Sequence, residues 1–327
     1  GPAVYHYLGV VWWWAWPVIA LVLLFLAWES TWMFWRQAMF KADIKCVLLE
    51  LNIPREINKT PEAMEQVLLA IHALRNAPGD LREHYWDGEV TRWYSLEIVS
   101  YGGEIHFYVR TYFKQKELVK AAFYSFYPDV EIVEVDDYAA NIPENVQQLY
   151  AQGYDMWGGE LKLFREEVFP IRTYKDFDAP AEESQFDPMS AFLEILGKIK
   201  KEEFVGIEFL IAPAPLEWKK EWESFVEKLK EPRMKKEKKN SPEGEATSFA
   251  KMIMRSPGET AVLEAVDRNL SKPAFDTIIR FLYLSPKSMF YDSFARRGLL
   301  GAFNQYASLD LNVLRHNYAI ATRTRLW

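Results

Sequence analysis

The residues able to do acid–base or metal chemistry are scattered along this sequence. The five histidines occur singly, at His6, His72, His84, His106 and His316. None of them has a partner at the spacing of a metal site. The stretch from His84 to Glu89 offers one imidazole and two carboxylates, but an exposed turn with two aromatic anchors is the favoured interpretation of it.

Sequence motifs of nucleotide and nucleophilic chemistry are also missing. The pattern G-x-x-x-x-G-K-[ST] does not occur, and Gly102-Gly103 and Gly158-Gly159 are predicted to lie in short turns rather than ahead of a phosphate-binding helix. There is no G-x-S-x-G nucleophile elbow. Paired acids occur at Asp136-Asp137 and Glu166-Glu167, but the sequence does not place them in a pocket. We therefore expect a protein that is not an enzyme and that uses no cofactor or metal.

A second set of polar residues carries charge on or beside apolar strands. Its members are Arg55, Glu56, Glu97, Arg110, Arg172 and Arg280. One interpretation is that they contact a partner protein. The other is that they pair with each other and fix the packing between elements.

An uncharged stretch from Leu8 to Trp28 dominates the start of the chain. As a helix it would be about 31 Å long, close to the thickness of the hydrocarbon core of a bilayer. Tryptophans gather at both ends, as in the aromatic belts of membrane proteins: Trp12, Trp13, Trp14 and Trp16 at one end and Trp28, Trp32 and Trp35 at the other. A buried core helix would need a domain around it, and a secretory signal would need a small-residue cleavage site. The pattern therefore predicts a membrane-spanning helix.

The flanks of this stretch predict its orientation. No Lys or Arg precedes it, whereas Arg36, Lys41 and Lys45 follow it closely. By the positive-inside rule the C-terminal domains are then cytoplasmic, and the chain is a single-pass protein of the plasma (inner) membrane. The single cysteine, Cys46, agrees with a reducing compartment and is expected to be a small core residue. The net charge of -7 argues against a general nucleic-acid-binding surface.

After the anchor and connector, residues 1–42, the pattern predicts a first α+β domain over residues 43–138. Apolar strand patterns cover 44–53, 94–100, 105–111 and 130–135. Helical spacing covers 61–74 and 114–127, the second with Leu118, Val119, Ala122, Phe123 and Phe126 on its buried face. This is the β-α-β-β-α-β order of a ferredoxin-like domain.

A second ferredoxin-like layer is predicted over residues 160–317, after a linker at 139–159 and before a tail at 318–327. Strands are expected at 160–169, 204–212 and 275–284, and helices at 187–200, 216–229, 259–270 and 287–305.

This layer carries a basic, flexible insertion at about 228–258. Its basic residues are Lys228, Lys230, Arg233, Lys235, Lys236, Lys238 and Lys239. A solvated loop is the favoured interpretation, and contact with anionic lipid or nucleic acid is the alternative.

Several stretches resemble a family of membrane-anchored proteins of candidate-phylum bacteria with small genomes. They are residues 48–56, 63–65, 95–98, 104–110, 127–132, 136–138, 170–174, 187–188, 272–273, 279–280, 301–306 and 311–312. The likeness covers about residues 12–317. Members of that family carry a domain of unknown function, and their genes typically accompany conjugation-type or type IV secretion-like ATPases.

The resemblance implies a scaffold or adaptor of such a secretion or conjugation apparatus, anchored in the membrane and docking a partner ATPase. A homo-oligomeric ring is one arrangement that such a scaffold can take. The alternative is a module that binds single-stranded nucleic acid. Ferredoxin-like sheets do so through exposed aromatic rings, here Phe107, Tyr108 and Tyr112.

Overall fold

The computed structural model describes residues 2–54, 59–143, 145–177, 187–230, 256–290 and 294–320. The chain divides into two compact units. The first comprises Gly1–Lys45 and Arg75–Arg92, and the second Cys46–Leu74 and Trp93–Trp327. Each unit is considered by itself.

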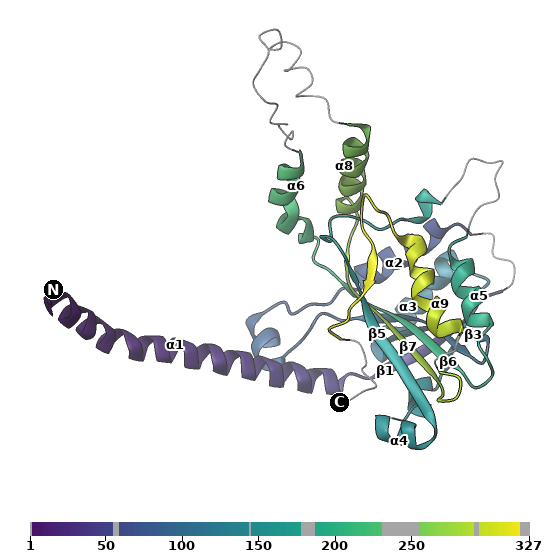
Figure 1. Ribbon diagram of the computed structural model, residues 1–327, viewed down its shortest axis with the longest axis horizontal. Coiled ribbons are helices and arrows are strands. Elements are labelled where there is room, and N and C mark those ends of the chain that lie inside the picture. Colours follow the sequence, from purple (N-terminus) through teal and green to yellow (C-terminus); the bar gives the residue numbers. More distant parts are fainter. Residues whose placement is uncertain are drawn as a thin grey trace, which may run out of the picture. The chain divides into compact units, whose positions relative to one another are not determined.

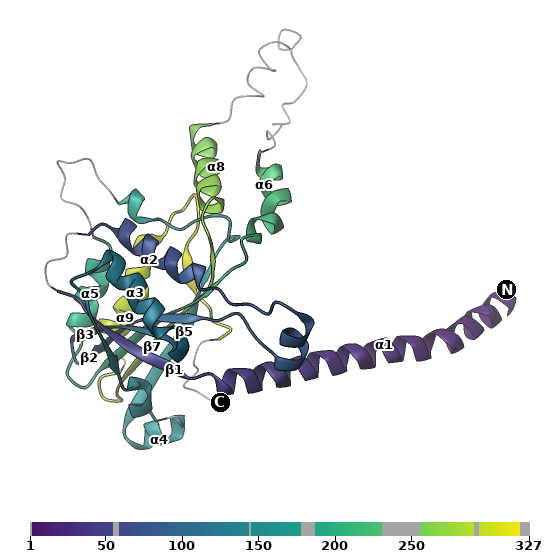
Figure 2. The same ribbon diagram turned by 180° about the vertical axis from the view of Figure 1, so that it is seen from behind.

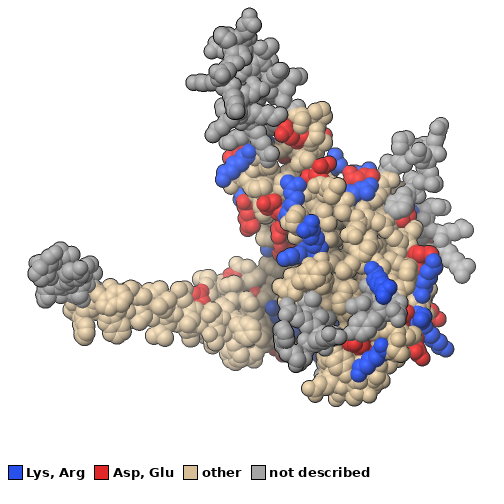
Figure 3. All heavy atoms as spheres, in the orientation of Figure 1, with Lys and Arg blue, Asp and Glu red and all other residues tan. Residues whose placement is uncertain are grey.

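The first unit is built on α1, a single helix from Pro2 to Asp43. Its segment Trp12–Asp43 contains an 18-residue window with a mean hydropathy of 1.8 and is long and apolar enough to cross a membrane. Its surface is nearly free of charged side chains (Figure 3). Pro17 lies inside the helix, and the predicted connector after Trp28 continues it without a break. A short π-helical turn, Glu83–Asp87, contacts α1.

The second unit contains one eight-stranded sheet in which every neighbouring pair is antiparallel (Figures 1 and 2). Its strands are β1 (Cys46–Asn52), β2 (Tyr94–Tyr101), β3 (Glu104–Tyr112), β4 (Glu131–Val135), β5 (Tyr154–Leu163), β6 (Phe204–Pro213), β7 (Phe275–Pro286) and β8 (Leu314–His316). Their order across the sheet is β4-β1-β3-β2-β6-β7-β5-β8. The chain is thus an α+β protein with an N-terminal apolar helix.

The two halves of this sheet repeat one strand order. The first half lies in the order β4-β1-β3-β2, and the second, counted from the far edge, in the corresponding order β8-β5-β7-β6. The halves join where β2 pairs with β6 from Tyr94–Ile211 to Tyr101–Phe204. Strand β2 would be an edge of the first half and β6 an edge of the second. Because they pair with each other, neither is left as an unpaired edge. The two expected layers therefore form one continuous sheet.

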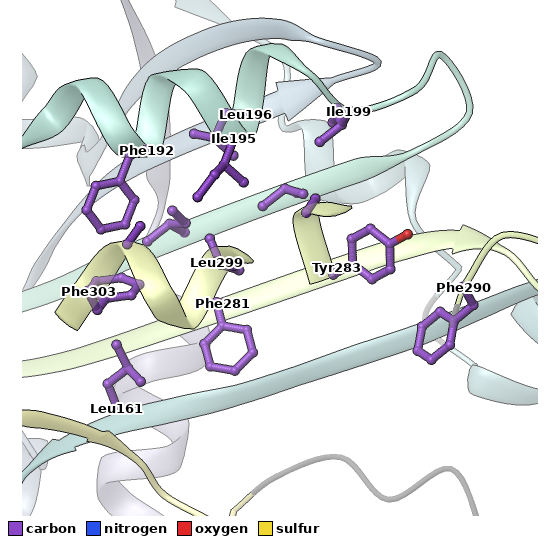
Figure 4. Close-up of a cluster of buried hydrophobic side chains, with 14 residues drawn as sticks. Leu161, Phe192, Ile195, Leu196, Ile199, Phe281, Tyr283, Phe290, Leu299 and Phe303 are labelled. Carbon is purple, nitrogen blue, oxygen red and sulfur yellow. The ribbon is translucent and has the colours of Figure 1, made fainter. Parts of the chain in front are cut away.

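Four helices cover one face of this sheet: α2 (Pro61–Ala73), α3 (Lys116–Phe126), α5 (Met189–Gly197) and α9 (Phe294–Phe303). Two hydrophobic clusters lie beneath them, one around α2 and α3 and one around α5 and α9. Tyr94 and Leu96 of β2 belong to the first cluster and Ile98 to the second, so both clusters lie on the same face. Figure 4 shows the second cluster, in which Leu299 of α9 lies beside Phe281 of β7 and Phe192 of α5 lies against Phe303 of α9.

Local sequence signals explain the ends of several elements. Thr60 precedes α2 and Pro61 occupies its first turn, as expected. The β2–β3 hairpin turns at Gly102 and Gly103, whose φ angles are +58° and +101°. A Cβ at Gly102 would also lie 2.8 Å from the backbone of Lys201, so glycine is required there for two reasons.

Between β6 and β7 the chain leaves the sheet. A 3-10 turn, Trp218–Trp222, leads into α6 (Glu223–Lys230), and α8 (Pro257–Leu270) returns. Ser256 and Glu259 form a capping box at the start of α8. The two helices pack on Val168 and Phe169 through Val226 and Val266.

Several details differ from the predictions. Strand β5 begins at Tyr154, inside the predicted linker, and a short helix, α4 (Val146–Ala151), precedes it. Gly158 and Gly159 lie within β5 and not in a turn. Their lack of side chains is needed because a Cβ at Gly158 would lie 3.0 Å from the carbonyl oxygen of Phe281. Leu118 and Cys46, both expected in the core, are exposed. Leu118 lies outside the buried face of α3. Cys46 shares a strand face with the buried Leu48 but is the first residue of β1.

Candidate functional site

The sheet face opposite the helices carries a row of polar side chains across the junction of the two halves. In cross-strand register, Glu97 of β2 lies between Tyr108 of β3 and Glu208 of β6. Glu208 lies opposite Arg280 of β7, which in turn lies opposite Glu160 of β5. Residues directly opposite on one face are close neighbours. Five strands therefore bring three carboxylates, a phenol and a guanidinium into one line.

Glu97 is the most buried member of this row, at 2% exposure. Its Oε1 accepts a hydrogen bond of 3.0 Å from Nε of Arg110, and its Oε2 accepts one of 2.6 Å from the hydroxyl of Tyr138. The same guanidinium donates two bonds, of 2.6 and 3.0 Å, to the carboxylate of Asp137. Arg110 thus joins β3 to β2 and to the segment that follows β4.

The ionisation of these groups follows from the network. Hydrogen bonding to Arg110 lowers the pKa of Asp137 below its usual range. Burial alone would lower the pKa of Arg110, but the carboxylates of Asp137 and Glu97 raise it. Burial, followed by the charge of Glu97, raises the pKa of Tyr138. Arg110 is therefore a cation and Tyr138 a hydrogen-bond donor at neutral pH.

Glu208 has fewer and weaker partners for its negative charge than Glu97 has. It accepts a hydrogen bond of 3.2 Å from Ser95, and Arg280 approaches it only to 3.8 Å. Burial and the neighbouring charge of Glu97 raise the pKa of Glu208. Arg280 keeps 52% of its side chain exposed. Arg280 is the exposed member of the row and Glu208 is partly exposed, so both are accessible to a ligand.

The row borders a hollow of about 600 Å³. Its uncharged lining includes Gly158, Gly206, Leu282, Tyr138, Ile142 and Ile320. Its charged lining residues are Glu97, Arg110, Asp137, Glu160, Glu208 and Arg280. Within the described ranges no group of three or more His, Cys, Asp or Glu residues could hold a metal ion. The hollow is suited to hydrogen bonds and ion pairs with polar or basic groups of a partner.

The predicted charged residues are partly brought together. Glu97, Arg110 and Arg280 line this hollow, and Glu97 and Arg110 also pair with each other. Arg172 lies elsewhere, with its guanidinium 4.3 Å from the ring of Phe177. Arg55 and Glu56 lie outside the described residues.

The sequence reasoning missed Glu208 and Tyr138. Glu208 is a lone charge within the apolar strand β6, the same signal that had marked Glu97 in β2. Tyr138 follows the end of a strand, and no sequence pattern there indicates its contact with Glu97.

The remaining candidate residues have varied surroundings. The side chains of Trp12, Trp13, Trp14, Trp16, Trp28 and Trp35 are exposed. Lys228 and Lys230 lie at the end of α6, where Lys230 pairs with Asp267 of α8 at 3.0 Å. Arg233, Lys235, Lys236, Lys238 and Lys239 lie outside the described residues. Tyr108 and Tyr112 are buried, so the prediction that they are exposed rings is wrong.

The fold and the site define an α+β protein with one helix capable of spanning a membrane and a polar hollow on the face of its sheet opposite the helices. The chain belongs to the family described as Domain of unknown function (DUF8128), whose model matches residues 45–313. The match includes seven of the eight strands and the row of polar side chains described above. No curated protein matches this chain.

Proposed function

We propose that this protein is a membrane-anchored adaptor that presents its sheet unit to a partner protein at the cytoplasmic face of the membrane. The anchor is α1, whose segment Trp12–Asp43 combines an apolar composition with side chains that are not buried. The basic residues Arg36, Lys41 and Lys45 on its C-terminal side support the cytoplasmic orientation.

In this proposal each half of the sheet unit is a ferredoxin-like domain. The element order β1-α2-β2-β3-α3-β4 and the strand order β4-β1-β3-β2 support that assignment for the first half. The second half has the order β8-β5-β7-β6, with α6 and α8 as its insertion. The two domains act as one rigid platform because β2 and β6 pair along their whole length.

The hollow beside Glu208 and Arg280 is the proposed docking site. The observation that carries the proposal is that Arg280 is half exposed and only loosely paired, whereas Glu97 and Arg110 are held in place by several hydrogen bonds. An accessible charge, Arg280, beside the fixed pair of Glu97 and Arg110 is suited to recognition of a protein surface. The resemblance to proteins encoded beside secretion-like ATPases supports such an ATPase as the partner in this proposal.

The test is co-purification of the tagged full chain, in mild detergent, with the ATPase encoded beside it. The variant is Arg280→Glu, and the matched control is Lys162→Glu, a charge reversal at an exposed residue of β5 that does not line the hollow. We expect the wild-type chain and the control to retain the ATPase and Arg280→Glu to lose most of it. Absence of the ATPase from the wild-type preparation, or equal retention by both variants, would refute the proposed docking.

A further inference from the structure

A short segment of the first unit, residues 79–88, is attached to α1 by two side-chain hydrogen bonds. The indole Nε1 of Trp32 donates to the carbonyl oxygen of Tyr85 at 2.6 Å. The hydroxyl of Tyr85 donates in return to Oε1 of Glu29 at 3.1 Å. Glu29 and Trp32 are three residues apart and therefore lie on one face of the helix.

Ring and backbone contacts extend this attachment along the same helix face. The rings of Trp32 and Trp86 are 5.7 Å apart. One turn further, the backbone of Gly88 lies so close to Arg36 that a Cβ would be 2.5 Å from the Arg36 carbonyl carbon. Gly88 also has a φ of +68°, so a side chain is disfavoured twice. The segment is thus fixed against residues 29–36 of α1.

Although it is fixed, the segment exposes two large apolar side chains. Leu81 is 76% exposed and Trp86 is 64% exposed. In water these side chains leave a substantial apolar area unburied, which is unfavourable. A tryptophan beside the end of a membrane span is in contrast well placed, because indole rings concentrate at the level of the lipid headgroups.

The level of attachment along α1 agrees with this location. The uncharged stretch ends at Trp28. At about 1.5 Å per residue, Trp32 lies roughly 6 Å beyond that point. The headgroup region on each side of the hydrocarbon core is about 5–8 Å deep. Glu29 directly follows the uncharged stretch, and its carboxylate accepts the hydrogen bond from Tyr85. This hydrogen bond raises the pKa of the Tyr85 hydroxyl.

We propose that residues 79–88 form a second membrane contact, in which Leu81 and Trp86 insert into the lipid headgroup region beside the end of α1. This inference rests on the proposed membrane anchor. It assigns the lipid interface as the surface that covers these two side chains. It also gives Trp32 a specific role, since its partly buried indole donates the hydrogen bond that holds the contacting segment.

The test uses nitroxide labels on the full chain in phosphatidylcholine vesicles. Cys46 is the only cysteine, so Cys46→Ser provides a background without thiols. Single labels are placed at Leu81→Cys, Trp86→Cys, Phe25→Cys and Leu309→Cys. Leu81→Cys is the main site because it leaves Trp86 in place. Phe25 lies within the uncharged stretch, and Leu309, at 96% exposure, is the aqueous reference.

Accessibility of each label to oxygen and to a water-soluble nickel complex measures its depth. We expect the label at Phe25 to be shielded from nickel, that at Leu309 to be fully accessible, and those at Leu81 and Trp86 to be several-fold less accessible to nickel than Leu309. If Phe25 is shielded but Leu81 and Trp86 match Leu309, the second contact is refuted and the anchor stands. If Phe25 itself is accessible to nickel, the anchor is refuted and the inference with it.

Discussion

Replacement of Arg110 by methionine is expected to destabilise the sheet unit strongly, although Arg110 is not at the centre of the hydrophobic core. Its guanidinium makes one hydrogen bond to Glu97 and two to Asp137. Methionine has a similar length but no charge. The substitution therefore leaves two carboxylates without their cation.

The two carboxylates contribute unequally to the expected loss. The side chain of Asp137 is 44% exposed, so water can solvate it, and its pair with Arg110 is worth at most about 1 kcal/mol. The side chain of Glu97 is 1% exposed and would keep only Tyr138 as a partner. Breaking a buried ion pair on one side costs about 3–5 kcal/mol in the free energy of unfolding. At roughly 2–4 °C per kcal/mol, the melting temperature should fall by on the order of 10 °C.

Glu97→Gln in the Arg110→Met background should recover part of this loss. The amide no longer carries the uncompensated charge, and its oxygen still accepts from Tyr138. Lys162→Met, at an exposed position, should change the free energy of unfolding by less than about 0.5 kcal/mol.

The assay is unfolding of the full chain in mild detergent, followed by tryptophan fluorescence. The difference between wild type and Arg110→Met should shrink by the share of Asp137 as the pH falls below about 4. There the unfolded chain binds a proton at Asp137 that the folded wild type, with its lowered pKa, binds only at a still lower pH. A loss below about 1 kcal/mol for Arg110→Met, or a double variant less stable than the single one, would contradict the reasoning.

Two further predictions concern stability. Gly159→Ala should lower the free energy of unfolding by about 1–3 kcal/mol, because its Cβ would overlap Nε2 of His316. Gly258→Ala, with open space around it in α8, should instead stabilise the protein slightly. Thermal unfolding of both variants checks this, and equal melting temperatures would contradict it. Because burial and then Glu97 raise the pKa of Glu208, its charge opposes folding at neutral pH. Stability of the wild type should therefore rise as the pH falls through that raised pKa towards about 4.5, and Glu208→Gln should remove this rise. Urea unfolding between pH 7 and pH 4.5 measures it, and an unchanged profile in the variant would be evidence against the assigned environment.

Local patterns were sufficient where a residue's neighbours in the sequence determine its environment. The hairpin at Gly102-Gly103 and the start of α2 at Pro61 were predicted correctly, because turn geometry and helix capping depend on a few adjacent residues. The start of β5 was predicted too late. Gly158 and Gly159 resemble turn residues, and only the approach of Phe281 and His316 explains why glycines lie inside that strand.

The sequence by itself determined that α1 can span a membrane, since length, apolarity and the absence of charge are properties of one contiguous stretch. It also marked Glu97, Arg110 and Arg280 as unusual charges on apolar strands. Only the tertiary structure decided that the two halves form one sheet, because the pairing of β2 with β6 joins residues more than a hundred positions apart. That pairing places Glu208 beside Glu97, and the attachment of residues 79–88 to Trp32 is likewise a contact between distant parts of the chain. Both sites depend on register and packing, which no local pattern in the sequence contains.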